Sequence, residues 1–178
     1  MRQFHRIAAA ALATALSILV AAPGSTEESP YVITSRQIPP EYKTTVEFLE
    51  YLKPARESPK GGFDPVIAPK WDLARLMSFI ADDGLIVSDV NRGGKAQKLS
   101  GKQIRNAVTA RKGQVFVTLT HLGYIYAQPY KHYSELGFDP QAGGGVVVRV
   151  ADWYRLAFAQ QGGQLKLTRL DYLMREGG

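Results

Sequence analysis

Apolar residues in the first part of the chain recur at helical spacing. This spacing predicts three helices, within residues 39–55, 70–83 and 99–113. Pro54 stops the first helix, Asp82-Asp83-Gly84 closes the second and Gly113 stops the third. The intervening residues 54–69 contain four prolines and a Gly-Gly pair, which is typical of a loop. The apolar positions that define the helices are Tyr42, Val46 and Leu49; Leu73, Leu76, Met77 and Ile80; and Ile104, Ala107 and Val108.

From residue 115 onward the pattern changes to the alternation that is typical of β-strands. A strand is predicted over residues 115–123, with one face formed by Val115, Val117, Leu119 and His121. Two longer strands are predicted over residues 146–159 and 164–174, on either side of the hairpin-turn sequence QQGGQ. In the last strand the apolar phase slips after Leu167, which predicts a β-bulge near Thr168-Arg169.

The order of these elements predicts the fold class. A shorter strand, LIVSDV at residues 85–90, follows the second helix, and the next residues, NRGGK, predict a hairpin-like reversal. Residues 123–145 are interpreted as a long insertion between strands, which leaves the strand order open. Because the helices come first, we predict an α+β fold with a curved antiparallel sheet wrapped around about three N-terminal helices.

The N-terminus has the order of charge, apolar core and small residues that is typical of a cleaved export signal. Arg2 and Arg6 form a basic start, Ile7–Val20 carry no charge, and Ala21-Ala22 follow. The apolar run is shorter than the roughly 20 residues that span a bilayer, and an uncleaved N-terminal anchor is the alternative. We expect an exported protein, periplasmic or secreted, with no stable membrane span after cleavage. The expected parts are a signal peptide at 1–22, a mobile leader at 23–38 and a single domain at 39–176.

Composition excludes several kinds of chemistry. The chain has no cysteine, so disulfides, thiolate catalysis and cysteine-bound metals are excluded. Its net charge of +6 falls to +4 when the two signal arginines are removed, which leaves 20 basic against 16 acidic residues. The basic residues are scattered, so no nucleic-acid partner is expected. A loose basic cluster at 92–112 is interpreted as a solvated face, with an anionic membrane surface or cell-wall polymer as the alternative contact.

Two short motifs resemble the early half of the NTF2-like superfamily, which includes SnoaL-like and ketosteroid-isomerase-like proteins. The stretch FIADDGLIVSD resembles the helix that ends there in an acidic pair before the first strand, and LSGKQIRNAV resembles the GK-x-x-I opening of the next helix. The closing YRLAFAQQGGQLKLTRLDYL resembles the terminal hairpin of that fold. The resemblance covers about residues 41–174 and implies a cone-shaped sheet around three helices, often enclosing a pocket. Dimerisation, which is frequent in that superfamily, makes a homodimer an expectation by analogy only.

Two ionisable residues interrupt apolar strand faces in this pattern. His121 continues the face of residues 115–119, and Asp152 stands in the apolar phase of residues 146–158, as does Tyr154. A carboxylate on an apolar face is unfavourable unless it is paired or lines a pocket. If the strands keep these phases, His121, Asp152 and Tyr154 converge inside the cone as a general base, an orienting carboxylate and a hydroxyl donor.

Structural interpretations stand beside this catalytic one. His121 and Asp152 can form a hydrogen bond within the core, or a bulge at Ala151 can turn Asp152 outward and bring Trp153 inward. The adjacent Asp82 and Asp83 point in different directions on a helix and are interpreted as its polar end. No metal site is predicted, because the histidines show no ligand spacing, and no cofactor motif is present.

Aromatic residues crowd the segment 123–145, where they either fix a long loop onto the domain or form a binding surface for protein or sugar. The residues predicted to bind a ligand are Tyr124, Tyr126, Tyr130, Tyr133 and Trp153.

Two functions from different classes follow. The first is an exported non-catalytic domain that binds a small apolar ligand or an envelope protein partner, and the absence of a complete catalytic motif favours it. The alternative is a small cofactor-free isomerase, dehydratase or hydrolase that uses His121, Asp152 and Tyr154. The superfamily hosts both kinds of protein, so the fold alone does not decide between them.

Overall fold

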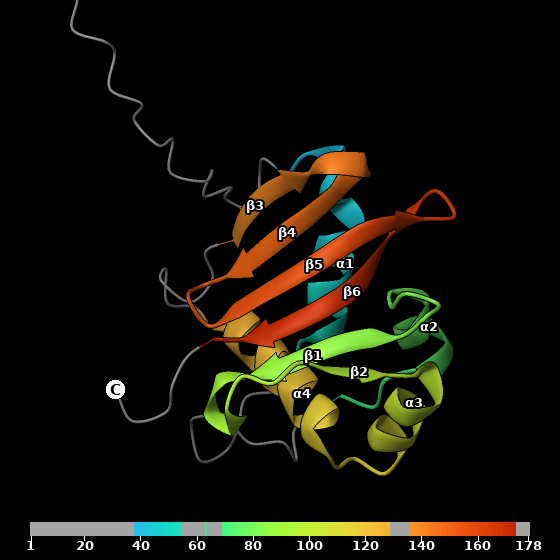
Figure 1. The fold of residues 1–178 in the computed structure, drawn as a ribbon, viewed down its shortest axis with the longest axis vertical. Coiled ribbons are helices and arrows are strands. Elements are labelled where there is room, and N and C mark those ends of the chain that lie inside the picture. The colour runs from blue at the N-terminus through green and yellow to red at the C-terminus, as the bar shows by residue number, and fades with distance from the viewer. Residues whose placement is uncertain (1–37, 55–62, 64–68, 129–135, 174–178) are drawn as a thin grey trace, which may run out of the picture.

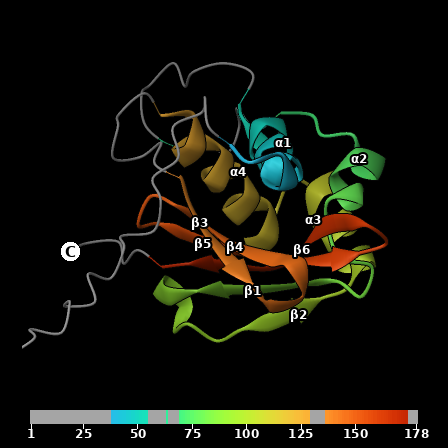
Figure 2. The same ribbon diagram turned by 90° about the horizontal axis from the view of Figure 1, so that it is seen from above.

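Six strands form one open, curved sheet, and the helices α1 and α4 lie over one of its faces (Figures 1 and 2). The computed structural model describes residues 38–54, 63, 69–128 and 136–173. The predicted signal peptide, nearly all of the leader and most of the predicted loop at 54–69 lie outside the described residues. The helices are α1 (Lys43–Leu52), α2 (Leu73–Ser78), α3 (Gly101–Thr109) and α4 (Gln114–Ala127). The strands are β1 (Leu85–Asp89), β2 (Gln97–Leu99), β3 (Leu136–Gln141), β4 (Gly145–Val150), β5 (Tyr154–Gln161) and β6 (Gln164–Tyr172). Short 3₁₀ turns cover Pro40–Tyr42, Val90–Arg92 and Ala142–Gly144.

The three predicted helices are present, with differences at their ends. α1 follows the 3₁₀ turn at Pro40–Tyr42, and its most buried face is formed by Thr45, Phe48, Leu49 and Leu52. Val46, which we expected on the core face, is only half buried. α3 begins at a capping box, in which the Ser100 hydroxyl accepts from the Gln103 N–H and the Gln103 side chain accepts from the Ser100 N–H.

The second helix is shorter than predicted, because β6 competes for the backbone after Ser78. The Ala81 N–H donates to the Leu167 carbonyl at 3.0 Å, and the Leu167 N–H donates to the Phe79 carbonyl at 2.7 Å. Asp82 and Asp83 are therefore in a turn before β1, both exposed, and Asp83 pairs with Lys98 at 2.7 Å.

The strand predicted over residues 115–123 is wrong: these residues belong to the helix α4. Valine and threonine at alternating positions gave a β-like pattern, but the buried apolar residues also fit helical spacing, and nearly the whole segment is buried. The Thr120 hydroxyl donates to the Phe116 carbonyl at 2.8 Å, so it is satisfied inside the helix. Apolar core residues of α4 are Val115, Phe116, Leu119, Leu122 and Ile125.

The long insertion predicted at 123–145 is consequently wrong as well. Its first residues complete α4, and residues 136–141 form the edge strand β3, which pairs antiparallel with β4 from Leu136↔Val150 to Gln141↔Gly145. The sheet order is β2-β1-β6-β5-β4-β3. All described pairs are antiparallel except β1 and β6, which run parallel, so the sheet is mixed rather than purely antiparallel.

The single strand predicted over residues 146–159 is two strands, joined by a tight turn at residues 151–153. Ala151 adopts φ = 48°, in the left-handed region that non-glycine residues rarely occupy. We predicted that Asp152 faces inward because it would continue the alternation of Val146, Val148 and Val150. The chain turns after Val150, so Asp152 is not part of that strand and the prediction is wrong.

Replacing Ala151 by glycine is expected to stabilise the domain. A non-glycine residue in left-handed geometry costs about 1–2 kcal/mol, and the greater freedom of glycine in the unfolded chain offsets part of that gain, so we expect about 0.5–1 kcal/mol. Urea unfolding checks this value. Ala157→Gly in β5 is the control, and it should destabilise instead; the same loss at both positions would contradict the argument.

The last hairpin is confirmed in detail. Gly162 and Gly163 have φ values of 58° and 78°, as a two-residue type I′ turn requires. Pairing passes from Ala157↔Arg169 to Phe158↔Leu167, which leaves Thr168 as the extra residue of the predicted bulge. The Thr168 hydroxyl donates to the Ala157 carbonyl at 3.0 Å.

The core lies between the sheet and the helices α1 and α4. On the sheet side it contains Val146, Val148, Leu156, Phe158, Leu167 and Leu170, and α1 and α4 contribute Phe48, Leu49, Leu52, Phe116, Leu119 and Leu122. Within the described part of the chain, no helix has both the length and the apolar character needed to cross a membrane.

Candidate functional site

His121 and Tyr154, two of the three predicted catalytic residues, lie together in the structure. His121 comes from α4, and Tyr154 is the first residue of β5. The imidazole Nδ1 and the phenol oxygen are 2.7 Å apart, which is a short hydrogen bond. The Tyr154 hydroxyl also lies 3.5 Å from the carbonyl oxygen of Thr118, one turn before His121 on α4.

Aromatic rings surround the imidazole. Ring centroids lie 4.7–6.1 Å from that of His121, and the rings belong to Phe63, Tyr124, Trp153, Tyr154 and Tyr172. Burial lowers the pKa of His121 to about 4, because the charged form loses its hydration. At neutral pH the imidazole is therefore neutral, with one nitrogen that donates and one that accepts.

In the part of the chain that the structure describes, the two carboxylates next to these rings in sequence, Asp152 and Asp171, do not support the imidazole. Asp152 is exposed in the turn between β4 and β5. Asp171 is buried, but it precedes Tyr172 on a strand, so the two side chains point to opposite faces of the sheet. Asp171 accepts from the Ser88 hydroxyl at 2.6 Å and from Arg169 Nε at 2.8 Å. Among the described residues, no group of three or more metal-binding side chains is present.

The predicted ligand-binding aromatics are distributed over different elements. Tyr124 and Tyr126 lie on α4 and not in a loop, while Tyr130 and Tyr133 lie outside the described residues. The Tyr126 hydroxyl donates to Glu50 Oε1 at 2.8 Å. The pKa of this phenol is raised, mainly by burial and also by the neighbouring Glu50 carboxylate. Trp153 is half buried, with its ring 5.4 Å from that of His121.

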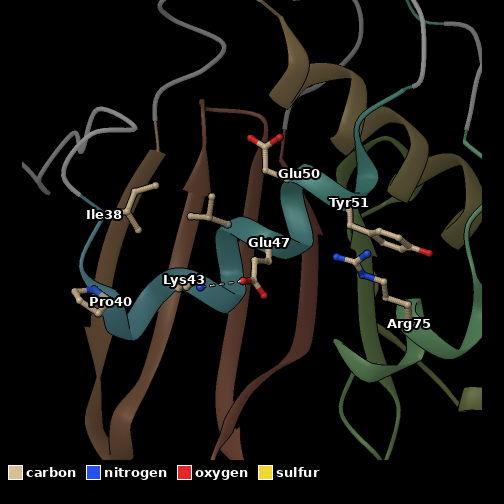
Figure 3. A pocket seen from close by; sticks show the side chains of 8 residues that line it. Ile38, Pro40, Lys43, Glu47, Glu50, Tyr51 and Arg75 are labelled. Carbon is tan, nitrogen blue, oxygen red and sulfur yellow. Dashed lines mark ion pairs between the residues drawn. The ribbon is translucent and has the colours of Figure 1, made fainter.

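A groove along the outer side of α1 is the feature that the sequence analysis missed (Figure 3). Its volume is about 690 Å³, within the roughly 300–1,000 Å³ that small-molecule sites occupy. The lining residues are Ile38, Pro40, Lys43, Val46, Glu47, Glu50, Tyr51 and Arg75. Val46, which we expected on the core face, packs against the core while it also lines this groove, and a position with both contacts gives no separate signal in the sequence.

Charges in this groove are unevenly compensated. Glu47 lies 3.7 Å from Lys43, and Glu50 lies 2.8 Å from Lys53. The guanidinium of Arg75 lies over the ring of Tyr51, 4.9 Å from its centroid. Its described contact is therefore with an aromatic ring, whereas each of the two glutamates is paired with a lysine. Figure 3 places Arg75 and Tyr51 at one end of the groove and Ile38 and Pro40 at the other.

Comparison of this chain with protein-family models, curated proteins and solved structures gives no match. The class is therefore defined by the fold and the sites alone. The described chain is an α+β domain with an open, curved, six-stranded sheet, a groove outside α1 and a neutral histidine enclosed by aromatic rings.

Proposed function

We propose that this protein is an exported, non-catalytic NTF2-like domain that binds a small apolar ligand in the groove along α1. The observation that carries the proposal is the groove itself, whose volume suits a small molecule and whose walls include Ile38, Pro40 and Val46. Export is proposed from the charge and apolar pattern of residues 1–22.

Three local features and the shape of the sheet support the NTF2-like part of the proposal. The acidic pair Asp82-Asp83 lies one residue before β1, although α2 already ends at Ser78, and Gly101 to Ile104 open α3 as the GK-x-x-I element does in that superfamily. The β5–β6 hairpin closes the described chain, and the curved sheet carries helices on one face (Figure 2).

The ligand is expected to carry an acidic group on an apolar body. Glu47 and Glu50 are both paired with lysines, whereas the guanidinium of Arg75 lies over the Tyr51 ring, with the Asp72 carboxylate bound to the Arg75 backbone N–H. We expect an added carboxylate to pair with this guanidinium. The apolar body would then contact Ile38, Pro40 and Val46 at the far end of the groove.

The catalytic alternative has a specific observation in its favour, the 2.7 Å contact between His121 and Tyr154. It required Asp152 to orient the imidazole, and that carboxylate is exposed in a turn. With its pKa lowered to about 4, His121 is a weak base, which also favours a binding function over proton abstraction. An envelope protein is the alternative partner.

Val46→Asp is expected to weaken binding of the apolar dye ANS about tenfold, because a charge would replace an apolar contact. Fluorescence titration gives the affinity. Val117→Asp is the matched control: Val117 is also helical, is 39% exposed and does not line the groove. Equal affinities for the two variants would contradict the proposed site.

Arg75→Gln separates the acidic group from the apolar body. In competition with ANS, decanoate should lose affinity for this variant while decanol keeps it, because decanol lacks the carboxylate that Arg75 would bind. Equal losses for both competitors would argue against a role for Arg75 in recognising an acid.

A further inference from the structure

The face of the sheet that lies opposite α1 and α4 carries two arginines side by side. Figure 1 shows this outer face in front, with the two helices behind the strands. Arg149 on β4 and Arg155 on β5 are directly opposed in the antiparallel pairing. Their chain neighbours Val148 and Leu156 are buried in the core, so both arginines project from the outer face, where they are exposed.

The carboxylate in the same row of the sheet does not neutralise these arginines. Asp171 on β6 is directly opposite Arg155, but it accepts from the Ser88 hydroxyl and from Arg169 Nε instead. Among the described residues, neither Arg149 nor Arg155 has an ion pair or a side-chain hydrogen bond. The row therefore contains two positive charges that are not compensated within the described chain.

The neighbouring strand and turn leave the two charges unpaired as well. Asp139 on β3 and Asp152 in the turn after β4 are both exposed, and neither forms an ion pair with the arginines in the described chain. The Arg149 side chain leans over Gly137 on β3, away from β5, because a Cβ on that glycine would lie 3.5 Å from Arg149 Nε. Like charges directly opposed in a sheet are destabilising, and an anion bound at the arginines removes that repulsion.

The surroundings of the arginines indicate what carries the anion. A small soluble ligand is usually enclosed in a concave site, whereas these side chains stand on the open face of a sheet. Leu173, just after β6, is 46% exposed. Its N–H donates to the Trp153 carbonyl, so it continues the alternation of β6 and lies on the same face as Asp171. Cations beside an exposed apolar side chain suit a lipid, with its acidic headgroup and apolar chains.

We propose that the outer face of the sheet binds the phosphate headgroup of an acidic phospholipid. The phosphate oxygens accept hydrogen bonds from the guanidinium groups of Arg149 and Arg155, and Leu173 contacts the start of the acyl chains. A phosphate monoester is favoured, because its charge of about −1.5 to −2 at neutral pH matches two guanidinium groups. The site lies on the other side of the sheet from α1, and it does not depend on the function proposed for the α1 groove.

The test titrates the full ¹⁵N-labelled chain with the short-chain lipid dihexanoyl phosphatidic acid. The backbone N–H signals of Arg149, Arg155 and Leu173 are expected to shift in a saturable manner. Dihexanoyl phosphatidylcholine, which has the same chains and no net headgroup charge, should bind at these residues at least about tenfold more weakly. Glycerol 3-phosphate, which has the phosphate without the chains, should also bind more weakly.

Three outcomes of this titration overturn the proposal. Equal binding of phosphatidylcholine would show that the arginines do not recognise the charge of the phosphate. Equal binding of glycerol 3-phosphate would show that the occupant is a soluble phosphate and not a lipid. The absence of a saturable shift at the three residues would show that the face binds neither.

A pair of double variants separates this site from a general attraction by net charge. Arg149→Gln with Arg155→Gln should weaken the binding of dihexanoyl phosphatidic acid, followed at the Leu173 signal, by about tenfold or more. Both arginines are exposed, so this variant should fold, and circular dichroism checks that it does. Lys43→Gln with Lys53→Gln removes the same net charge from the ends of α1, on the other side of the sheet, and should leave the affinity unchanged. Equal affinities in the two double variants would overturn the proposal.

Val46→Asp separates this site from the α1 groove, which can also take an acidic apolar molecule. The variant should leave the shifts at Arg149, Arg155 and Leu173 intact while it weakens ANS binding in the groove. The two proposals can therefore fail separately, and loss of the sheet-face shifts in Val46→Asp would overturn the one made here.

Discussion

Gly123→Ala is expected to remove about 3 kcal/mol or more of the free energy of unfolding. A Cβ at this position would lie 2.1 Å from the carbonyl oxygen of Leu52 and 2.7 Å from its carbonyl carbon. Those atoms are backbone, so the contact can be relieved only by moving α1 and α4 apart, and α1 and α4 bury the helical half of the core. Urea unfolding, followed by circular dichroism, measures the loss.

Gly101→Ala is the matched control for this prediction. It is also a helical glycine, but its added Cβ would meet only the terminal methyl group of Met77, at 3.2 Å. A flexible side chain can move, and alanine favours helix by up to about 1 kcal/mol, so this variant should be neutral or slightly stabilised. If Gly123→Ala were as stable as Gly101→Ala, the close contact between α1 and α4 would be wrong.

Acidification from pH 7.5 to pH 4.5 is expected to destabilise the domain by an amount that depends on His121. Burial lowers the pKa of His121 from 6.5 to about 4 in the folded state, so between these values the unfolded chain binds a proton that the folded chain does not. This contribution to stability is fully present above pH 6.5 and is lost as the pH falls towards 4. At 1.36 kcal/mol per pH unit, the full loss is roughly 3 kcal/mol.

His121→Phe tests the assignment. The ring keeps the aromatic packing with Trp153 and Tyr172 but does not titrate, so its stability should fall less between the two pH values than that of the wild type. Urea unfolding at both pH values gives the two slopes. Identical pH dependence in both proteins would show that His121 is not the titrating group.

Elements defined by local chemistry could be predicted from the sequence. The Gly162-Gly163 turn was predicted from adjacent residues, and the structure contains it. The capping box at Ser100 has an equally local basis, but we did not predict it. The bulge at Thr168 was predicted because a slip in apolar phase within one strand requires an unpaired residue. The α+β class followed from the order of these elements.

α4 could not be recognised by the same reasoning. Most of α4 is buried and its exposed Val117 is also apolar, so the helix has no clear polar face and its apolar positions fit a period of two as well as 3.6. Val115, Val117 and the threonines at 118 and 120 then favoured a strand through their β propensity. What decides the helix is tertiary: Gly123 allows α1 to approach, and no single segment of sequence records that contact.

The candidate sites were predictable to a limited extent. His121 and Tyr154 were expected to meet and do meet, although His121 arrives from a helix and not from a strand. Asp152 was predicted to lie on the inner face of a continuous strand. The chain turns at Ala151, so Asp152 is exposed instead. The α1 groove could not be predicted, because part of its wall is the contact between Arg75 and Tyr51. These residues are far apart in sequence and become neighbours only when α2 packs beside α1.

The position of β6 in the sheet has a consequence for biosynthesis. β6 is the last strand in the described chain, yet it lies between β1 and β5, so the β2–β1 pair and the β3–β4–β5 group are joined through it. Until residues 164–172 have been synthesised, β1 and β5 each lack a neighbouring strand and the six-stranded sheet cannot be completed. Such late, long-range pairing delays folding. This delay is compatible with the export that we propose from the N-terminal pattern.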